Sequence, residues 1–198
     1  GGGTCYPLKT MDEIAEVAKE NACTSHIDGA RIFNASVATG VEVSRMARDY
    51  DSISVCLSKG LGAPVGSVLV GSSEMMYRAH RWRKMFGGGM RQAGILAAAG
   101  LYALDNHIER MIEDHRLARR LAEAIDKMTS FSVDLAQVQT NMVYIGCSDG
   151  GAEDLVARLS NLGVDTLTID DSSIRAVTHL HLTDEDIERA IVAFESSQ

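Results

Sequence analysis

The sequence predicts an α/β protein in which a mainly parallel sheet is covered by helices, followed by a small α+β module. Helical and strand patterns alternate along the chain. The predicted strands are mostly short continuous apolar runs, which are typical of strands buried on both faces of a parallel sheet. The pattern changes near Asp105, where closely spaced short elements begin. We therefore expect two domains: the back part of a large sheet domain over residues 1–105, and a small C-terminal domain over residues 106–198.

In the first half, Thr10 and Glu13 form a capping-box pattern, and apolar residues then recur at helical spacing, which predicts a helix over Met11–Asn21. Ser72 or Ser73 can cap a basic helix, and the glycines from Gly87 onward should end it. The other elements expected here are strands at Cys23–Asp28, Ser52–Leu57 and Gly66–Val70, short helices at Phe33–Val37 and Val43–Asp49, and helices at Glu74–Met85 and Gln92–Leu104.

In the second half, apolar residues mark one face of a long amphipathic helix over His107–Met128. Gly163 is placed to stop a helix. The other elements expected are strands at Asn141–Ile145, Val164–Ile169 and Ile174–His179, a loop at Ser148–Gly151, and helices at Glu153–Leu162 and Asp184–Phe194.

Composition excludes several classes of protein. The chain carries 27 Asp and Glu residues against 19 Lys and Arg, a formal charge of −8, which argues against a general nucleic-acid binder. No apolar run reaches the roughly 18 residues of a membrane span, and no signal peptide is visible. The four cysteines form no CxxC pair, so neither structural zinc nor a disulfide framework is expected. These observations favour a cytoplasmic protein with reduced thiols.

Lys59 is the residue that most needs an explanation. It follows an apolar strand, and ligands of α/β sheets bind at the carboxyl ends of strands. A partly desolvated lysine there can form a Schiff base with an aldehyde, although most lysines at strand ends are solvated. Asp28 ends another predicted strand 31 residues earlier, about one crossover away. It is either a turn or helix-cap aspartate or the carboxylate that keeps a lysine-bound pyridoxal ring protonated.

Segments around these two residues resemble the low-specificity threonine aldolases of the beta-eliminating lyase family. The matching stretches are HIDGAR at residues 26–31, SVCLSKGLGAPVGS at 54–67 and FGGGMRQ at 86–92, with further likeness at residues 2–7 and 174–180. The resemblance covers essentially the whole chain, in order. It implies the fold of the aspartate aminotransferases (fold type I) and the cofactor pyridoxal 5'-phosphate.

The resemblance also implies roles for individual residues. Lys59 would carry pyridoxal phosphate covalently, and Asp28 would pair with its pyridinium nitrogen. Arg31 would reach the phenolic oxygen of the ring or the substrate carboxylate, although an arginine there is as often a surface ion-pair residue. Arg175 would clamp the substrate α-carboxylate with two parallel donors, which suits a charge placed in an otherwise apolar strand.

Two further cations belong to the region that, in this family, approaches the cofactor phosphate, in part from a neighbouring subunit. Arg91 follows the glycine cluster and opens a predicted helix, where anions bind, and Lys84 lies on the basic helix before it. Such basic runs are usually solvated faces. His179 and His181 share a strand face, but no third ligand at a sensible spacing supports a metal site, so none is expected.

By resemblance, the activity is carbon–carbon bond cleavage of L-threonine, L-allo-threonine and related β-hydroxy-α-amino acids to glycine and an aldehyde such as acetaldehyde. This is an aldehyde-lyase reaction of threonine catabolism and glycine formation, in a homo-oligomer (dimer or tetramer) with shared sites. The alternatives are another fold-type-I lyase or aminotransferase, or an inactive remnant that acts as an assembly module.

The family's phosphate-binding glycine–threonine turn and ring-stacking histidine have no counterpart here, and the chain begins without methionine. We therefore expect it to be the back part of a longer enzyme, with sheet edges and apolar helix faces exposed when isolated. Such a chain should aggregate or need a partner.

Overall fold

The computed structural model describes residues 2–147 and 151–198, so most of the loop expected at Ser148–Gly151 lies outside the described residues. The chain divides into two compact units, each described here by itself. The N-terminal unit is Tyr6–Glu109. The C-terminal unit is Arg110–Gln198 together with residues 2–5.

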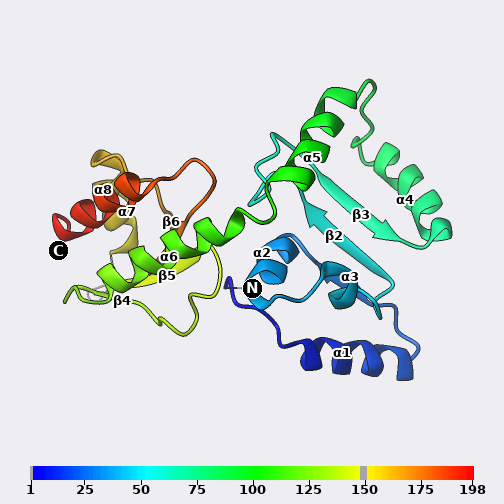
Figure 1. Cartoon of the computed structure of the whole chain (residues 1–198), viewed down its shortest axis with the longest axis horizontal. Helices are drawn as coiled ribbons and strands as arrows, with labels where there is room; N and C mark the ends of the chain where they lie inside the picture. Colours follow the sequence, from blue (N-terminus) through cyan, green and yellow to red (C-terminus); the bar gives the residue numbers. More distant parts are fainter. Residues whose placement is uncertain (1, 148–150) are drawn as a thin grey trace. The chain divides into compact units, whose positions relative to one another are not determined.

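The N-terminal unit has a three-stranded sheet in the order β1-β2-β3 and five helices among its described residues (Figure 1). Its elements are α1 (Leu8–Glu20), β1 (His26–Asp28), α2 (Ile32–Thr39), α3 (Val43–Met46), β2 (Ser52–Cys56), β3 (Ser67–Gly71), α4 (Ser73–Met85) and α5 (Gly94–Asn106).

The expectation of a mainly parallel sheet needs correction. β1 and β2 are parallel, but β3 runs antiparallel to β2. The residues between β2 and β3, 57–66, form turns and no helix, and a parallel return needs a crossover of about a dozen residues or more. The sheet is therefore mixed.

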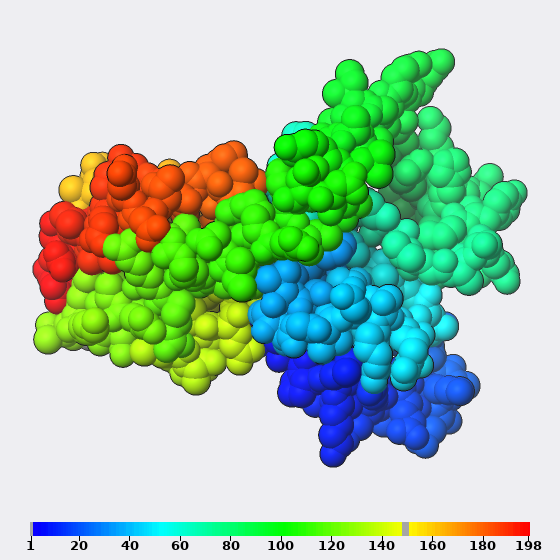
Figure 2. Space-filling view, viewed as in Figure 1, coloured from blue at the N-terminus to red at the C-terminus, as the bar shows by residue number. Residues whose placement is uncertain are grey.

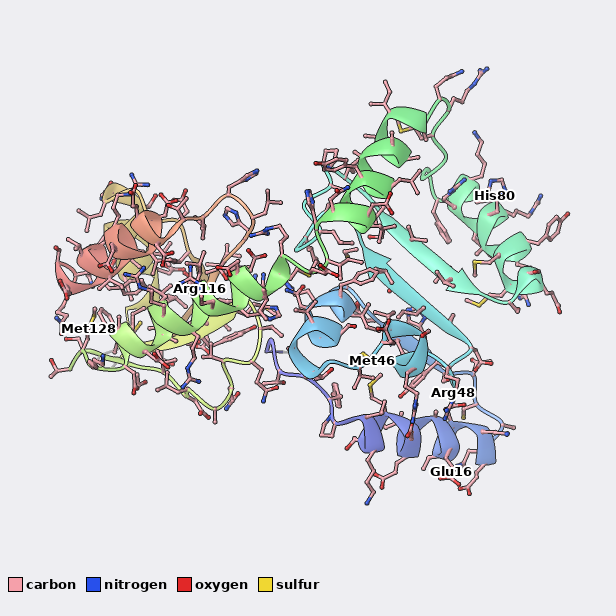
Figure 3. The ribbon with its side chains drawn as sticks, viewed as in Figure 1. Glu16, Met46, Arg48, His80, Arg116 and Met128 are labelled. Atoms are coloured by element: carbon pink, nitrogen blue, oxygen red, sulfur yellow. The ribbon has the colours of Figure 1, made fainter. Side chains whose placement is uncertain are left out.

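The core of the N-terminal unit lies on one face of this sheet. Ile53 and Val55 of β2 are buried with Ile32 of α2 and Met46 of α3, and α1 contributes Met11 at the edge of this cluster. Met46 is labelled in Figure 3. Because strand residues alternate between faces, the even-numbered residues of β1 and β2 lie on the opposite face of the sheet.

Helix starts in this unit test two predicted caps. Ser72 caps α4 as expected, since its hydroxyl accepts a hydrogen bond from the Met75 N–H at 3.3 Å. The prediction of a capping box that starts at Thr10 is wrong. α1 begins at Leu8 with Pro7 in the N-cap position, and the Pro7 carbonyl accepts from the Met11 N–H at 3.2 Å. A helix that starts there places Thr10 within its first turn.

The last two helices of the N-terminal unit are poorly covered. α4 has no buried residue, and α5 buries only Gly100 and Ala103 among its residues. In Figure 2 the segment from α4 to the start of α5 projects from the rest of its unit. The labelled His80 of α4 extends into open space in Figure 3. β3 is exposed at four of its five positions.

Among its described residues, the C-terminal unit packs three helices on one antiparallel sheet of order β4-β5-β7-β6. Its elements are α6 (Met111–Ile125), β4 (Phe131–Ser132), β5 (Met142–Cys147), α7 (Ala152–Asn161), β6 (Leu167–Asp170), β7 (Ser173–Val177) and α8 (Asp184–Glu195). α6 starts four residues later than the sequence pattern predicts, because His107 closes α5 by donating its N–H to Ala103. The two-residue strand β4 was not predicted from the sequence.

The core of the C-terminal unit lies between the sheet and α6, α7 and α8. Val143 and Ile145 of β5 pair with Ala176 and Ile174 of β7, and all four are buried in this core. Phe194 of α8 is also buried there. Among the described residues, no helix is long and apolar enough to span a membrane.

Candidate active site

The carboxyl ends of β1 and β2 lie at the same edge of the N-terminal sheet. Asp28, the last residue of β1, pairs in parallel register with Ser54 of β2. Both lie on the face away from the α1–α3 core, since Ile27 and Ile53 occupy the core face. Asp28 is exposed, so its carboxylate is accessible at the strand end where α/β sheets bind ligands.

Gly29 allows the chain to pass close to β2 directly after Asp28. A Cβ atom on Gly29 would lie 2.8 Å from both Ile53 Cδ1 and the Ser54 carbonyl oxygen, so no larger residue fits without movement. The Asp28 carboxylate accepts a hydrogen bond from the Ala30 N–H at 3.2 Å, which is an Asx turn. This turn leads into Arg31, the half-buried N-cap residue of α2.

Lys59 lies in a hydrogen-bonded turn that leaves the end of β2. Its carbonyl oxygen accepts from the Gly62 N–H at 2.8 Å, and the Leu57 carbonyl accepts from the Ala63 N–H at 3.0 Å. Gly62 has φ +71°, a left-handed conformation that glycine adopts readily. The Lys59 side chain is exposed, while the backbone around it is held. The structure therefore brings Asp28, Arg31 and Lys59 to one end of the β1–β2 pair.

Lys84 and Arg91 lie farther along the N-terminal unit and are exposed. Lys84 is in the last turn of α4, where its side chain lies against Gly89. Arg91 does not open a helix as expected, because α5 begins three residues later, at Gly94. Neither side chain belongs to an ion pair within the described part of the chain.

Arg175 belongs to the C-terminal unit and lies on the face of its sheet away from the helical core. It pairs with Tyr144 of β5 on one side and Leu167 of β6 on the other. The side chain is half-buried, and its Nε is buried with no hydrogen-bond partner among the described residues. A buried guanidinium N–H without an acceptor is costly, so this position favours an anionic ligand.

Other polar groups have more ordinary roles. The His26 ring contacts the Ser52 hydroxyl at 2.8 Å. The rings of His179 and His181 meet edge to face, 5.7 Å apart, and the described residues hold no cluster of three His, Cys, Asp or Glu side chains that would suit a metal ion. Burial raises the thiol pKa of Cys5 and Cys147, which disfavours the thiolate form.

No sequence pattern singled out His107. Its Nδ1 lies 2.7 Å from the carbonyl oxygen of Leu61, two residues after Lys59. The sequence pattern placed this histidine only as the first residue of the long helix expected over His107–Met128. Such a residue is indistinguishable from a solvated helix end until the helix is placed beside the turn.

Comparison with known proteins links these features to one group of enzymes. The family model described as beta-eliminating lyase matches residues 1–148. The chain is 42% identical over 199 residues to low-specificity L-threonine aldolase 1 of Arabidopsis thaliana, covering 99% of this chain and 56% of that protein. It is 44% identical over 186 residues to the low specificity L-threonine aldolase of Escherichia coli K12, covering 93% of this chain and 54% of the relative.

A solved structure of threonine aldolase from Leishmania major superposes with a TM-score of 0.77 at 17% identity, covering 96% of this chain and 56% of that one. The fold expected for the chain, that of the type I enzymes, is therefore confirmed. The chain spans little more than half the length of the relatives it matches.

Proposed function

The chain belongs to the beta-eliminating lyase family, and on this premise we propose that it is the lysine-bearing part of a pyridoxal-phosphate enzyme. The proposed reaction is cleavage of L-threonine, L-allo-threonine and related β-hydroxy-α-amino acids to glycine and an aldehyde. The names of the relatives suggest this substrate class. The main structural support is that Asp28 and the Lys59 turn leave the same edge of a parallel strand pair.

The residues at this edge fit the cofactor chemically. An exposed primary amine and an exposed carboxylate follow neighbouring strands, and Gly29 keeps the intervening backbone close to the sheet. We assign Lys59 to covalent attachment, Asp28 to holding a proton on the pyridine nitrogen, and Arg31 to the phenolic oxygen or the substrate carboxylate. When bound, the cofactor supplies an electron sink for the electrons of the broken Cα–Cβ bond.

Arg175 would bind the substrate carboxylate, and its buried Nε without a described acceptor supports this role. A guanidinium binds a carboxylate through two parallel N–H donors and so fixes the orientation of the amino acid. Orientation matters because the bond that breaks must stand across the plane of the cofactor ring.

The remaining proposals concern assembly and context. Lys84 and Arg91 are exposed cations, and we assign them to the cofactor phosphate, in part across a contact between copies. This assignment goes with a homo-oligomer, a dimer or a tetramer. A cytoplasmic enzyme of threonine catabolism and glycine formation is the corresponding cellular role.

Covalent trapping tests the proposal directly. The purified chain is incubated with pyridoxal phosphate, reduced with borohydride and mapped by peptide mass. We expect the label on Lys59 and its loss in Lys59→Ala, while Lys9→Ala, at an exposed lysine of α1, should leave the labelling unchanged. Threonine cleavage is then measured by product analysis. Glycine with acetaldehyde supports the aldolase proposal, whereas other products would support another fold-type-I lyase or an aminotransferase.

Asp28→Asn separates the electronic role from attachment. The amide cannot hold the pyridine proton as a carboxylate does. We therefore expect the rate of threonine cleavage to fall on the order of 100-fold, while pyridoxal phosphate is still trapped on Lys59. A rate near that of the unsubstituted protein would contradict the role of Asp28. The part of the relatives that this chain does not cover can be supplied as a second polypeptide. If pyridoxal phosphate is still not trapped on Lys59, the result would favour the inactive assembly module instead.

A further inference from the structure

The turn that carries Lys59 is anchored by the side chain of the residue that caps the C-terminus of α5. His107 Nδ1 lies 2.7 Å from the Leu61 carbonyl oxygen. A carbonyl oxygen only accepts hydrogen bonds, so Nδ1 carries the proton and donates it. Leu61 is 1% exposed, so water cannot easily replace the donor, and loss of the bond would leave a buried carbonyl unsatisfied.

One face of α5 is shaped for this contact. Gly100, Ala103 and His107 recur at helical spacing on the same side. Gly100 is buried, and a Cβ atom there would lie 3.1 Å from Leu57 Cδ1. Ala103 is also buried. Small residues thus let α5 approach the end of β2, and its C-cap residue presents the imidazole to Leu61.

The anchored carbonyl lies within the hydrogen bonds that shape the turn. The Gly62 N–H donates to the Lys59 carbonyl oxygen, and the Ala63 N–H donates to the Leu57 carbonyl oxygen, so Leu61 lies inside both hydrogen-bonded turns. The Tyr102 ring meets the His107 ring edge to face at 5.4 Å, which restricts the rotation of the imidazole. The fixed turn therefore depends on a histidine 46 residues away from Leu61.

We propose that His107 is a positioning residue that fixes the Lys59–Gly62 turn and thereby holds the Lys59 amine at the β1–β2 edge. The proposal rests on the role assigned to Lys59 above. His107 acts through the Leu61 carbonyl and touches neither cofactor nor substrate.

Two variants of His107 separate the effect of its hydrogen-bond donor from the effect of the size of its ring. His107→Asn keeps an N–H at the same distance along the side chain as Nδ1, whereas His107→Phe keeps a ring without a donor. Asn106→Ala is the matched control, because it removes a side-chain hydrogen bond to Tyr102 at the same helix end and does not touch the turn. If the Phe variant does not fold, His107→Leu, which also lacks a side-chain donor, takes its place.

The first readout is amide hydrogen exchange at Gly62 and Ala63 in the whole chain. Loss of one hydrogen bond should accelerate their exchange about threefold to tenfold in His107→Phe. His107→Asn and Asn106→Ala should exchange as the unsubstituted chain does. Unchanged exchange in His107→Phe would overturn the proposal, and so would equal acceleration in all three variants.

The second readout is the rate at which added pyridoxal phosphate labels Lys59 before borohydride trapping. Labelling should slow about threefold to tenfold in His107→Phe and return to the original rate in His107→Asn. An unchanged labelling rate in His107→Phe would refute the positioning role. If Lys59 is not labelled in any form, even when the part of the relatives that this chain does not cover is supplied, while the exchange at Gly62 still responds, the proposed function fails and the anchoring of the turn by His107 stands.

Discussion

The two units of this chain differ in how completely they bury their apolar residues. Within the described residues, the C-terminal unit has one continuous core of eighteen buried apolar side chains, drawn from three helices, three strands and the residue that follows β4. The corresponding cluster of the N-terminal unit has four. The C-terminal unit is thus packed like an independent small domain, whereas the unit that carries Lys59 is not.

The exposed apolar residues show the same difference. They gather in the later part of the N-terminal unit, on β3, α4 and α5 and the loops beside them; the exposed set there is Val65, Val68, Leu69, Val70, Tyr77, Trp82, Met85, Phe86, Met90, Ile95, Leu101 and Tyr102. Exposed apolar side chains that gather in one region are typical of a surface that another surface covers. We therefore expect the unit with the proposed chemistry to depend on contacts outside itself, and the C-terminal unit to be stable through its own core.

The largest expected effect compares a core residue of one unit with an exposed strand residue of the other. Phe194 is fully buried and meets Phe131 edge to face at 5.5 Å, so Phe194→Ala should cost about 3–5 kcal/mol of the free energy of unfolding. Leu69 is 38% exposed on β3, and Leu69→Ala should cost less than about 1 kcal/mol. Urea unfolding followed by circular dichroism measures both, and equal losses would contradict the comparison.

A smaller effect tests what the C-terminal unit contributes to the chemistry. Arg175→Lys keeps the charge but loses the paired donors, so we expect the KM for the amino acid to rise on the order of 10-fold. Steady-state kinetics measures this change. Arg189→Lys is the matched control, because Arg189 is an exposed α8 residue paired with Asp186. An unchanged KM in Arg175→Lys would remove Arg175 from substrate binding.

Self-association of the isolated chain tests the exposed strand. Val70 of β3 is half exposed, and a lysine there should disfavour pairing and apolar contact between copies. We expect Val70→Lys to lower the associated fraction severalfold in sedimentation velocity, with Ser67→Lys, at the other end of β3, as a comparison. If the unsubstituted chain is monomeric and unfolds cooperatively, the exposed surface of β3 does not need to be covered by another surface, and this prediction is wrong.

The smallest effect is a pH dependence in the C-terminal unit. Burial lowers the pKa of the His115 ring below its ordinary value of 6.5, and the nearby Asp114 carboxylate only partly opposes the shift. The unfolded chain therefore binds this proton at a higher pH than the folded unit does. The contribution of the neutral His115 ring to the free energy of unfolding should be fully present above about pH 6.5 and decline as the pH falls toward the folded-state pKa. Unfolding of His115→Gln should show a weaker decline over that range.

Several features of the site were predictable because they are encoded locally. The runs that form β1 and β2 are apolar and each ends directly before a polar motif, so Asp28 and the Lys59 turn were expected at strand ends. The parallel pairing of these strands puts both ends at one edge. The cap of α4 at Ser72 was equally local, because a serine hydroxyl needs only the N–H three residues on.

Sequence alone determined which residues stand at the ends of β1 and β2 and that the chain resembles one family, because both depend on short contiguous patterns. Only the tertiary structure decided that β3 runs antiparallel, that Arg175 shares a sheet face with Tyr144, and that His107 holds Leu61. The second and third features join segments far apart in the chain, and the first depends on the path of the connection 57–66. Their formation depends on strand register and helix packing, which no local pattern encodes.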